Sequence, residues 1–164
     1  LKIDYHYHLL QTIFSKLEVD KYKLVLISKD LKPKHLNIIS ENTLVSHLKI
    51  EFTEVGENHI VAKMPVDETT FQPMGILHGG ASVALAETVG SCGSHFIIDN
   101  TTHYAVGIEI NANHVGSAFD GFVYATGKIV HAGRTTHIWN IEIKDESEKL
   151  ISIARLTMMI LKRS

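Results

Sequence analysis

The sequence is poor in cysteine, nearly neutral in charge, and free of long apolar runs. Cys92 is the only cysteine among 164 residues, so no internal disulfide can form and we expect a reducing, cytoplasmic location. The formal net charge of −2 provides no basic footprint, and we expect neither nucleic acid nor an anionic membrane as a partner. The apolar runs are too short and interrupted to span a bilayer.

Other missing motifs argue against several kinds of site and segment. The eleven histidines are scattered without C-x-x-C or H-E-x-x-H spacing, so we expect no metal site. No G-x-S-x-G segment occurs, which argues against the serine chemistry of an α/β-hydrolase. The segment "LKIDYHYHLLQTIF" lacks the apolar core and cleavage site of a secretory signal, and we expect none. The length suits one domain without internal repeats.

The chain divides into two parts by composition. Residues 1–35 are rich in Lys, Tyr and His, and we interpret them as an N-terminal extension of uncertain structure. Residues 36–164 form the predicted main domain, whose patterns are sharper. It opens with "LNIISENTLVSHL", which has helical spacing at Leu36, Ile39, Leu44 and Leu48.

The main domain predicts strands around one long helix. Residues 48–66 alternate on both sides of a Gly-Glu-Asn turn and predict a hairpin, and residues 79–97 predict the helix. Four strand candidates follow: "AVGIEINANH", "GFVYATGKIVH", "THIWNIEIKD" and "KLISIARLTMMIL". In the first, strict alternation places Val106, Ile108, Ile110 and Ala112 on one face. The order predicts an α+β fold with the helix covering one face of an antiparallel sheet.

A single acid, Glu87, interrupts the long helix. At about 100° per residue, Glu87 shares one stripe with Ser91 and Ser94. The opposite face carries apolar residues suited to packing on a sheet, namely Leu85, Val89 and Phe96. A lone helical Glu is usually solvated, but solvated faces carry cations too, and no Lys or Arg occurs between positions 78 and 98. From the pattern alone, both a solvated and a functional Glu87 stay open.

The helix begins at His78-Gly79-Gly80, where side chains do not block the backbone. The first N–H groups of a helix are unpaired and lie at the positive end of its dipole, which suits a carbonyl oxygen gaining negative charge. His78 suits a cap at least as well as a catalyst. Two helical turns, about 11 Å, separate these amides from Glu87. One substrate atom therefore needs one of the two groups from a second subunit, which indicates a dimer with a shared cleft.

Four motifs in order carry a family resemblance: "QPMGILHGGASVALAETVGS", "GIEINANHVGSA", "HAGRTTHIWNIEIKDE" and "RLTMMIL". From about residue 36 to 162 the chain resembles hotdog-fold acyl-CoA thioesterases, in the branch of the hydroxybenzoyl-CoA and 1,4-dihydroxy-2-naphthoyl-CoA enzymes. The resemblance implies a long helix wrapped by a curved antiparallel sheet, dimers or tetramers, and an active site between protomers. It implies hydrolysis of an aromatic or bulky acyl-CoA, with CoA as part of the substrate and no separate cofactor.

The resemblance also implies roles for individual residues. Glu87 matches the catalytic carboxylate, acting as nucleophile or general base, and the Gly79 amide matches the donor that polarises the thioester carbonyl. Gln72 matches a glutamine near the carbonyl or the attacking water. Ser91 matches a Ser/Thr that holds water or the acyl group, and His78 matches the histidine that shapes the oxyanion loop.

The substrate-binding assignments follow the same motifs. His114 of "NANH" is expected beside the ligand, with Gly80 and Val115 as further contacts. Related enzymes commonly have Arg where this chain has Gly116, and that Arg could pair with a CoA phosphate. Its absence makes Arg134, in the "HAGR" turn, the candidate for phosphate contact, although an ordinary turn cation is the alternative.

Two other functions stay open at this point. A hotdog hydratase or dehydratase would use a His and an acid on a different motif, and the His78–Glu87 spacing does not match it. A non-catalytic acyl-CoA binding protein would not need the intact set of Gln72, Gly79, Glu87 and Ser91. The acyl group itself is not identified; dihydroxynaphthoyl-CoA, on the path to menaquinone, is one candidate.

Overall fold

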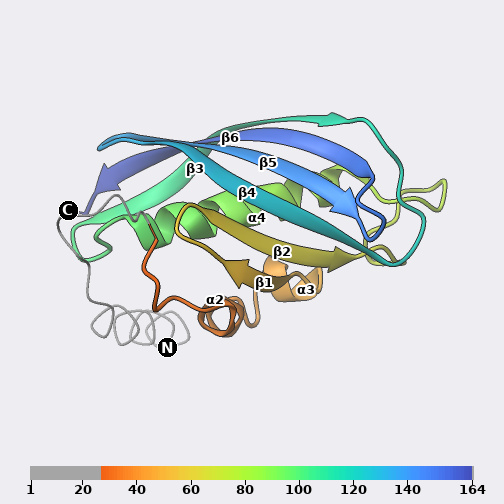
Figure 1. The fold of residues 1–164 in the computed structure, drawn as a ribbon, viewed down its shortest axis with the longest axis horizontal. Helices are drawn as coiled ribbons and strands as arrows, with labels where there is room; N and C mark the ends of the chain where they lie inside the picture. Colours follow the sequence, from red (N-terminus) through yellow and green to blue (C-terminus); the bar gives the residue numbers. More distant parts are fainter. Residues whose placement is uncertain (1–26, 164) are drawn as a thin grey trace.

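The computed structural model describes residues 27–163, in which a six-stranded antiparallel sheet curves around one long helix (Figure 1). The strands lie in the order β1-β2-β4-β5-β6-β3, which leaves β1 and β3 at the edges. Their bounds are β1 Glu51–Val55, β2 His59–Pro65, β3 His103–His114, β4 Phe122–Ala132, β5 Thr136–Asp145 and β6 Leu150–Lys162. The predicted hairpin, the four later strands and the α+β class are confirmed.

The long helix α4, Gly79–Ile97, has the predicted bounds and lies in the concave side of the sheet (Figure 1). Its predicted packing face is buried, because Leu85, Val89 and Phe96 all belong to the hydrophobic core. Each such side chain contributes roughly 1.5–3 kcal/mol when removed from water. Burial of this face fixes the helix against the sheet and thereby orients its remaining sides.

Ser94 is more deeply buried than Glu87 and Ser91, with which it shares a helical stripe. Its side chain is fully buried, and its Oγ accepts a hydrogen bond of 2.9 Å from Nε1 of Trp139. The same hydroxyl lies 3.1 Å from Nδ1 of His137. Helical periodicity gives the direction of a side chain, but it does not give how much of the helix surface the sheet covers. In the C-terminal half of α4, β5 also covers the side of the helix that carries Ser94.

The predicted strict alternation in β3 is wrong because the strand contains a bulge. Its register against β6 shifts between Gly107 and Glu109, and Ile108 is the extra residue. Beyond the bulge Ile110 and Ala112 pack against the core as expected, whereas Ile108 is half exposed. A bulge inverts the facing of the residues on one side of it, so Gly107 turns toward α4.

The segment predicted as one helix, residues 36–48, forms two short helices, α2 Pro33–Ile39 and α3 Leu44–His47. Between them Asn42 has a left-handed φ of 60°. Thr43 then caps α3, since its Oγ1 accepts a hydrogen bond from Val45 N at 3.2 Å. A turn-forming polar segment therefore overrides the apolar spacing, and Leu44 is left exposed.

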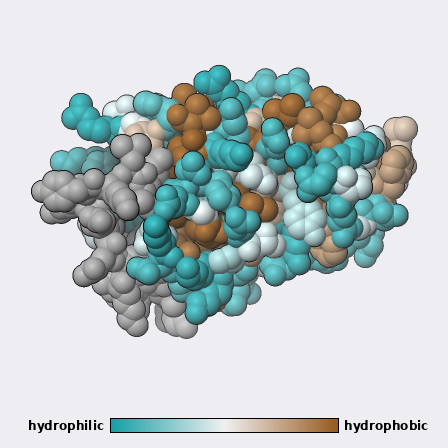
Figure 2. Space-filling view, viewed as in Figure 1, coloured by the Kyte–Doolittle hydropathy of each residue, from teal (hydrophilic) through white to brown (hydrophobic). Residues whose placement is uncertain are grey.

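The described part of the predicted extension packs on the main domain. Ile27 and Leu31 are buried in the same core as Leu36, and the other residues of the predicted extension, 1–26, lie outside the described residues. On the face shown in Figure 2, hydrophobic residues form separate patches on a mostly hydrophilic surface. None of the helices within residues 27–163 is long and apolar enough to cross a membrane.

Candidate active site

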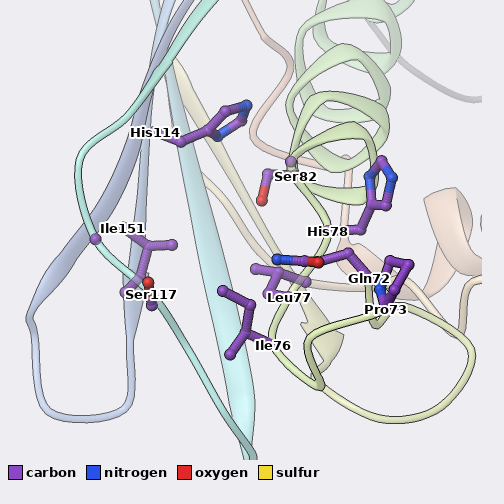
Figure 3. A pocket seen from close by; sticks show the side chains of 11 residues that line it. Gln72, Pro73, Ile76, Leu77, His78, Ser82, His114, Ser117 and Ile151 are labelled. Carbon is purple, nitrogen blue, oxygen red and sulfur yellow. The ribbon is translucent and has the colours of Figure 1, made fainter.

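A cavity of about 440 Å³ lies at the N-terminal end of α4 (Figure 3). The loop before the helix, the first helical turn, the end of β3 and the start of β6 all contribute to its wall. The lining residues are Gln72, Pro73, Ile76, Leu77, His78, Gly79, Ser82, His114, Gly116, Ser117 and Ile151. Its size is in the range of small-molecule sites, and its wall mixes aliphatic side chains with a few polar groups.

The first turn of α4 leaves one amide free at the cavity. His78 caps the helix, because its Nδ1 accepts a hydrogen bond of 2.8 Å from Gly80 N. Gly79 N, by contrast, donates to no group among the described residues. The capping interpretation of His78 is therefore confirmed, and Gly79 rather than Gly80 presents an unpaired donor at the positive end of the helix.

His114, at the end of β3, covers the bare Cα of Gly79. A Cβ added at position 79 would lie only 2.7 Å from Nε2 of His114. In Figure 3 the imidazole points from β3 toward the helix, above Ser82. The fold thus brings His114 and Gly79 together from segments 35 positions apart in the printed sequence, and both line the cavity as the predicted site requires.

Gln72 is held by its own loop. Its backbone N–H donates to Ile76 O at 2.8 Å, and its side-chain Oε1 accepts from Met74 N at 3.1 Å. The side chain extends into the cavity (Figure 3), and its amide nitrogen donates to no residue of the described segment. The loop therefore fixes the oxygen and leaves the N–H₂ group available to a ligand acceptor.

Glu87 does not line this cavity. Its partly buried side chain lies against β3, where its Oε1 accepts a 2.6 Å hydrogen bond from Oγ of Ser91. Within residues 27–163 it forms no ion pair, and its side chain is only partly exposed to solvent. Glu87 follows Gly79 by eight helical positions, about 12 Å of rise. One chain therefore holds two incomplete groupings rather than one site.

The remaining predicted contacts are dispersed. Val115 is more than half exposed and does not line the cavity, whereas its neighbour Gly116 does. Gly80 is exposed, and its amide is occupied by His78. Arg134 lies in the turn between β4 and β5, beside the end of the sheet where His137 meets Ser94, and is not part of the cavity wall. Its phosphate role stays a prediction.

Sequence reasoning missed several wall residues. Ser82 is buried and lies three positions after Gly79, so the helical period could have indicated it as a neighbour of the free amide. Ser117 and Ile151 reach the cavity through the pairing of β3 with β6 and the loop that follows β3. No local pattern encodes that pairing.

Two further chemistries find no support in the described chain. Residues 27–163 contain no group of three or more His, Cys, Asp or Glu side chains placed to hold a metal ion. Desolvation by the surrounding protein raises the pKa of the partly buried Cys92 thiol to about 12, so this thiol is not an activated nucleophile.

In comparisons with known proteins, the chain is similar to thioesterases and to a CoA thioester hydrolase. A family model described as the thioesterase superfamily matches residues 74–152. A 1,4-dihydroxy-2-naphthoyl-CoA hydrolase of Escherichia coli (strain K12) is 45% identical over 127 residues, covering 77% of this chain and 92% of that protein. The structure of a mutant thioesterase from Pseudomonas aeruginosa has a TM-score of 0.82 at 40% identity, covering 84% of this chain and 99% of that one. A thioesterase from Haemophilus influenzae has a TM-score of 0.80 at 42% identity, covering 84% and 95%.

Proposed function

The chain belongs to the thioesterase superfamily, and we propose that it hydrolyses acyl-CoA thioesters with Glu87 of one copy and the Gly79 amide of a second. The family membership confirms the resemblance inferred from the motifs, including the hotdog fold and the thioester hydrolase class. The residues that perform the reaction, the acyl group and the assembly are the subject of the proposal.

The observation that carries it is the division of the site within one chain. The free Gly79 N–H and the Glu87–Ser91 pair lie on the same helix, and Glu87 is absent from the cavity that Gly79 lines. The acid faces β3, an edge strand whose outer side pairs with no strand of residues 27–163. Such an edge is a template for pairing with another chain. A second copy added there, related by two-fold symmetry, brings the acid of each chain to the cavity of the other.

The reaction follows from these groups. The thioester carbonyl oxygen accepts a hydrogen bond from Gly79 N–H, with Gln72 as a second donor, and both strengthen as the oxygen becomes negative. Glu87 either attacks the carbonyl carbon or removes a proton from an attacking water. In both routes the C–S bond breaks, the CoA thiolate leaves and is protonated, and water supplies the oxygen of the acid product. No cofactor takes part in this proposal.

An aromatic or other bulky acyl group fits the wall. Ile76, Leu77 and Ile151 provide apolar contacts, while Ser82 and Gln72 provide polar ones. The Escherichia coli relative is named for a naphthoyl substrate, which supports aromatic acyl groups and, as the first pathway to test, menaquinone biosynthesis. The single cysteine supports a reducing compartment. Arg134 is the proposed contact for a CoA phosphate.

The test is removal of the acid. Glu87→Ala and Glu87→Gln should lower kcat for benzoyl-CoA and naphthoyl-CoA at least about a hundredfold, since a nucleophile or general base is lost. Thiol release measures the rate, and Glu68→Gln, an exposed acid in a loop, is the matched control with unchanged kcat. Unchanged turnover in the Glu87 variants would contradict the proposal. If the unaltered chain bound acyl-CoA tightly without releasing thiol, a binding protein would be supported. A hydrated acyl-CoA in the mass spectrum of its products would support a hydratase.

A further inference from the structure

The carboxylate of Glu87 faces a strand position that has no side chain. A Cβ added to Gly107 of β3 would lie 2.5 Å from Oε1 of Glu87 and 3.2 Å from its Cδ. The φ of Gly107 is not in the left-handed region, so its backbone would accept an alanine. The neighbouring carboxylate, rather than a constraint on the backbone conformation, is therefore what an added side chain would meet here.

The bulge in β3 is what places this glycine beside the acid. Ile110 and Ala112 face the core, and unbroken alternation backward from them would direct the side chain of Ile108 toward α4. The register shift between Gly107 and Glu109 inserts one residue, so Gly107 takes that place and Ile108 is half exposed. Bulges commonly re-aim side chains next to active sites. Here the result is that the carboxylate packs directly against bare backbone.

The other side of the carboxylate is fixed by a hydrogen bond. Ser91 Oγ donates to Oε1 of Glu87 at 2.6 Å and also lies 3.6 Å from Sδ of Met158. Met158 is the β6 partner of Gly107 in the sheet register. The carboxylate of Glu87 therefore lies between Ser91 on its own helix and the bare backbone of Gly107 on β3. Both of these residues lie beside Met158 of β6.

We propose that Gly107, together with the adjoining bulge, is a positioning element that sets where the Glu87 carboxylate meets the thioester. The inference rests on the proposed function, because it assigns Gly107 a role through Glu87. A Cβ at position 107 must displace the carboxylate by about 1 Å to reach ordinary contact, and misplacement of that size lowers rates by about 10²-fold. The carboxylate ends a flexible side chain, so it yields without strain in the fold.

Gly127 provides a matched control that faces the same helix from another strand. This β4 residue also faces α4, and an added Cβ would lie 2.5 Å from Cγ1 of Val89. The distance equals that at Gly107, but Val89 is fully buried and its β-branched side chain is stiff. The same one-carbon insertion must therefore repack the core at Gly127, whereas at Gly107 it moves only the acid.

The experiment compares Gly107→Ala with Gly127→Ala in the full chain, using thiol release and thermal unfolding. Gly107→Ala should lower kcat about thirty- to a hundredfold, with KM within about threefold of the unaltered chain and Tm nearly unchanged. Gly127→Ala should lower Tm by at least about 5 °C and keep the kcat of the folded protein. A double-mutant cycle with Glu87→Asp, whose shorter side chain withdraws the carboxylate, should reduce the effect of Gly107→Ala to about threefold or less.

The inference is overturned if Gly107→Ala keeps its kcat, or if its loss of kcat accompanies a Tm loss like that of Gly127→Ala. It is also overturned if Gly107→Ala lowers kcat by the same factor with Glu and with Asp at position 87. Should Glu87→Asp show no measurable turnover, the kcat and Tm of the two single variants decide. Failure of the proposed function has a separate signature, which is full turnover by Glu87→Ala.

Discussion

The two ends of α4 differ in whether their polar groups face an open cavity or lie in the buried core. At the N-terminal end, the N–H of Gly79 has no acceptor within residues 27–163, Gly80 is exposed, and a cavity of about 440 Å³ is open. At the C-terminal end, the hydroxyl of Ser94 is shared between the indole of Trp139 and the imidazole of His137, all buried. The N-terminal end therefore presents bare backbone to a potential ligand. At the C-terminal end, by contrast, the Ser94 hydroxyl is enclosed in a buried hydrogen-bond network.

This difference indicates a division of roles along one helix. Packing at the C-terminal end fixes the position and direction of α4 in the sheet, so the N-terminal end can leave polar groups unpaired without loss of order. We call the C-terminal end of α4 the closed end and the N-terminal end the open end. Substitutions at the closed end should therefore change stability, and substitutions at the open end should mainly change catalysis.

Trp139→Ala should give the largest effect and tests the closed end. The indole is fully buried, and its Nε1 donates to Ser94. Loss of such a side chain lowers the free energy of unfolding by about 3–5 kcal/mol. Urea unfolding measures this change, and thiol release under conditions that keep the chain folded should give a kcat within about threefold of the unaltered protein. A large kcat loss in folded Trp139→Ala would remove the distinction between the ends.

The pH dependence of stability sharpens the comparison at the same end. Burial, and secondarily the charge of Arg163, lowers the pKa of His95 from 6.5 to about 4. The unfolded chain therefore binds a proton on His95 at a higher pH than the folded chain does. The stabilisation is fully present above pH 6.5 and decreases as the pH falls toward 4, by about 3 kcal/mol. Burial also lowers the pKa of His137, so its effect has the same sign.

Urea unfolding between pH 7 and pH 4 measures that dependence. His95→Gln, which cannot titrate, should give a flatter curve over this range. An equally steep curve in His95→Gln would assign the acid sensitivity to other groups.

His78→Ala should give the smallest stability effect because it alters the open end. It removes the acceptor for Gly80 N and should lower the free energy of unfolding by about 1 kcal/mol, as loss of a helix cap does. His78→Asn, which retains a capping acceptor, should restore most of it. Equal stability losses in the alanine and asparagine variants would show that the cap is not what His78 contributes.

The two ends also differ in how far the sequence predicted them. The bounds of α4 and the Gly79 donor followed from a glycine-flanked helical period and from the unpaired amides of any helix start. The bulge at Gly107 and the burial of Ser94 could not be predicted, because both depend on pairing between distant strands. For the same reason the sequence did not place Ile151 in the cavity or Arg134 outside it. Local periodicity specifies elements, whereas sheet register specifies which side chains meet.

Subunit complementation tests the central claim most directly. Glu87→Ala removes the acid. Gly79→Pro removes the amide proton and adds a ring beside His114, while proline is still favoured at the first position of a helix. The two inactive variants are co-expressed with different tags, and mixed assemblies are purified through both tags. These assemblies should regain about a quarter to a half of normal thiol release, because one intact acid meets one intact amide across each mixed interface. Mixed assemblies as inactive as their parents would contradict a site shared between two copies of the chain.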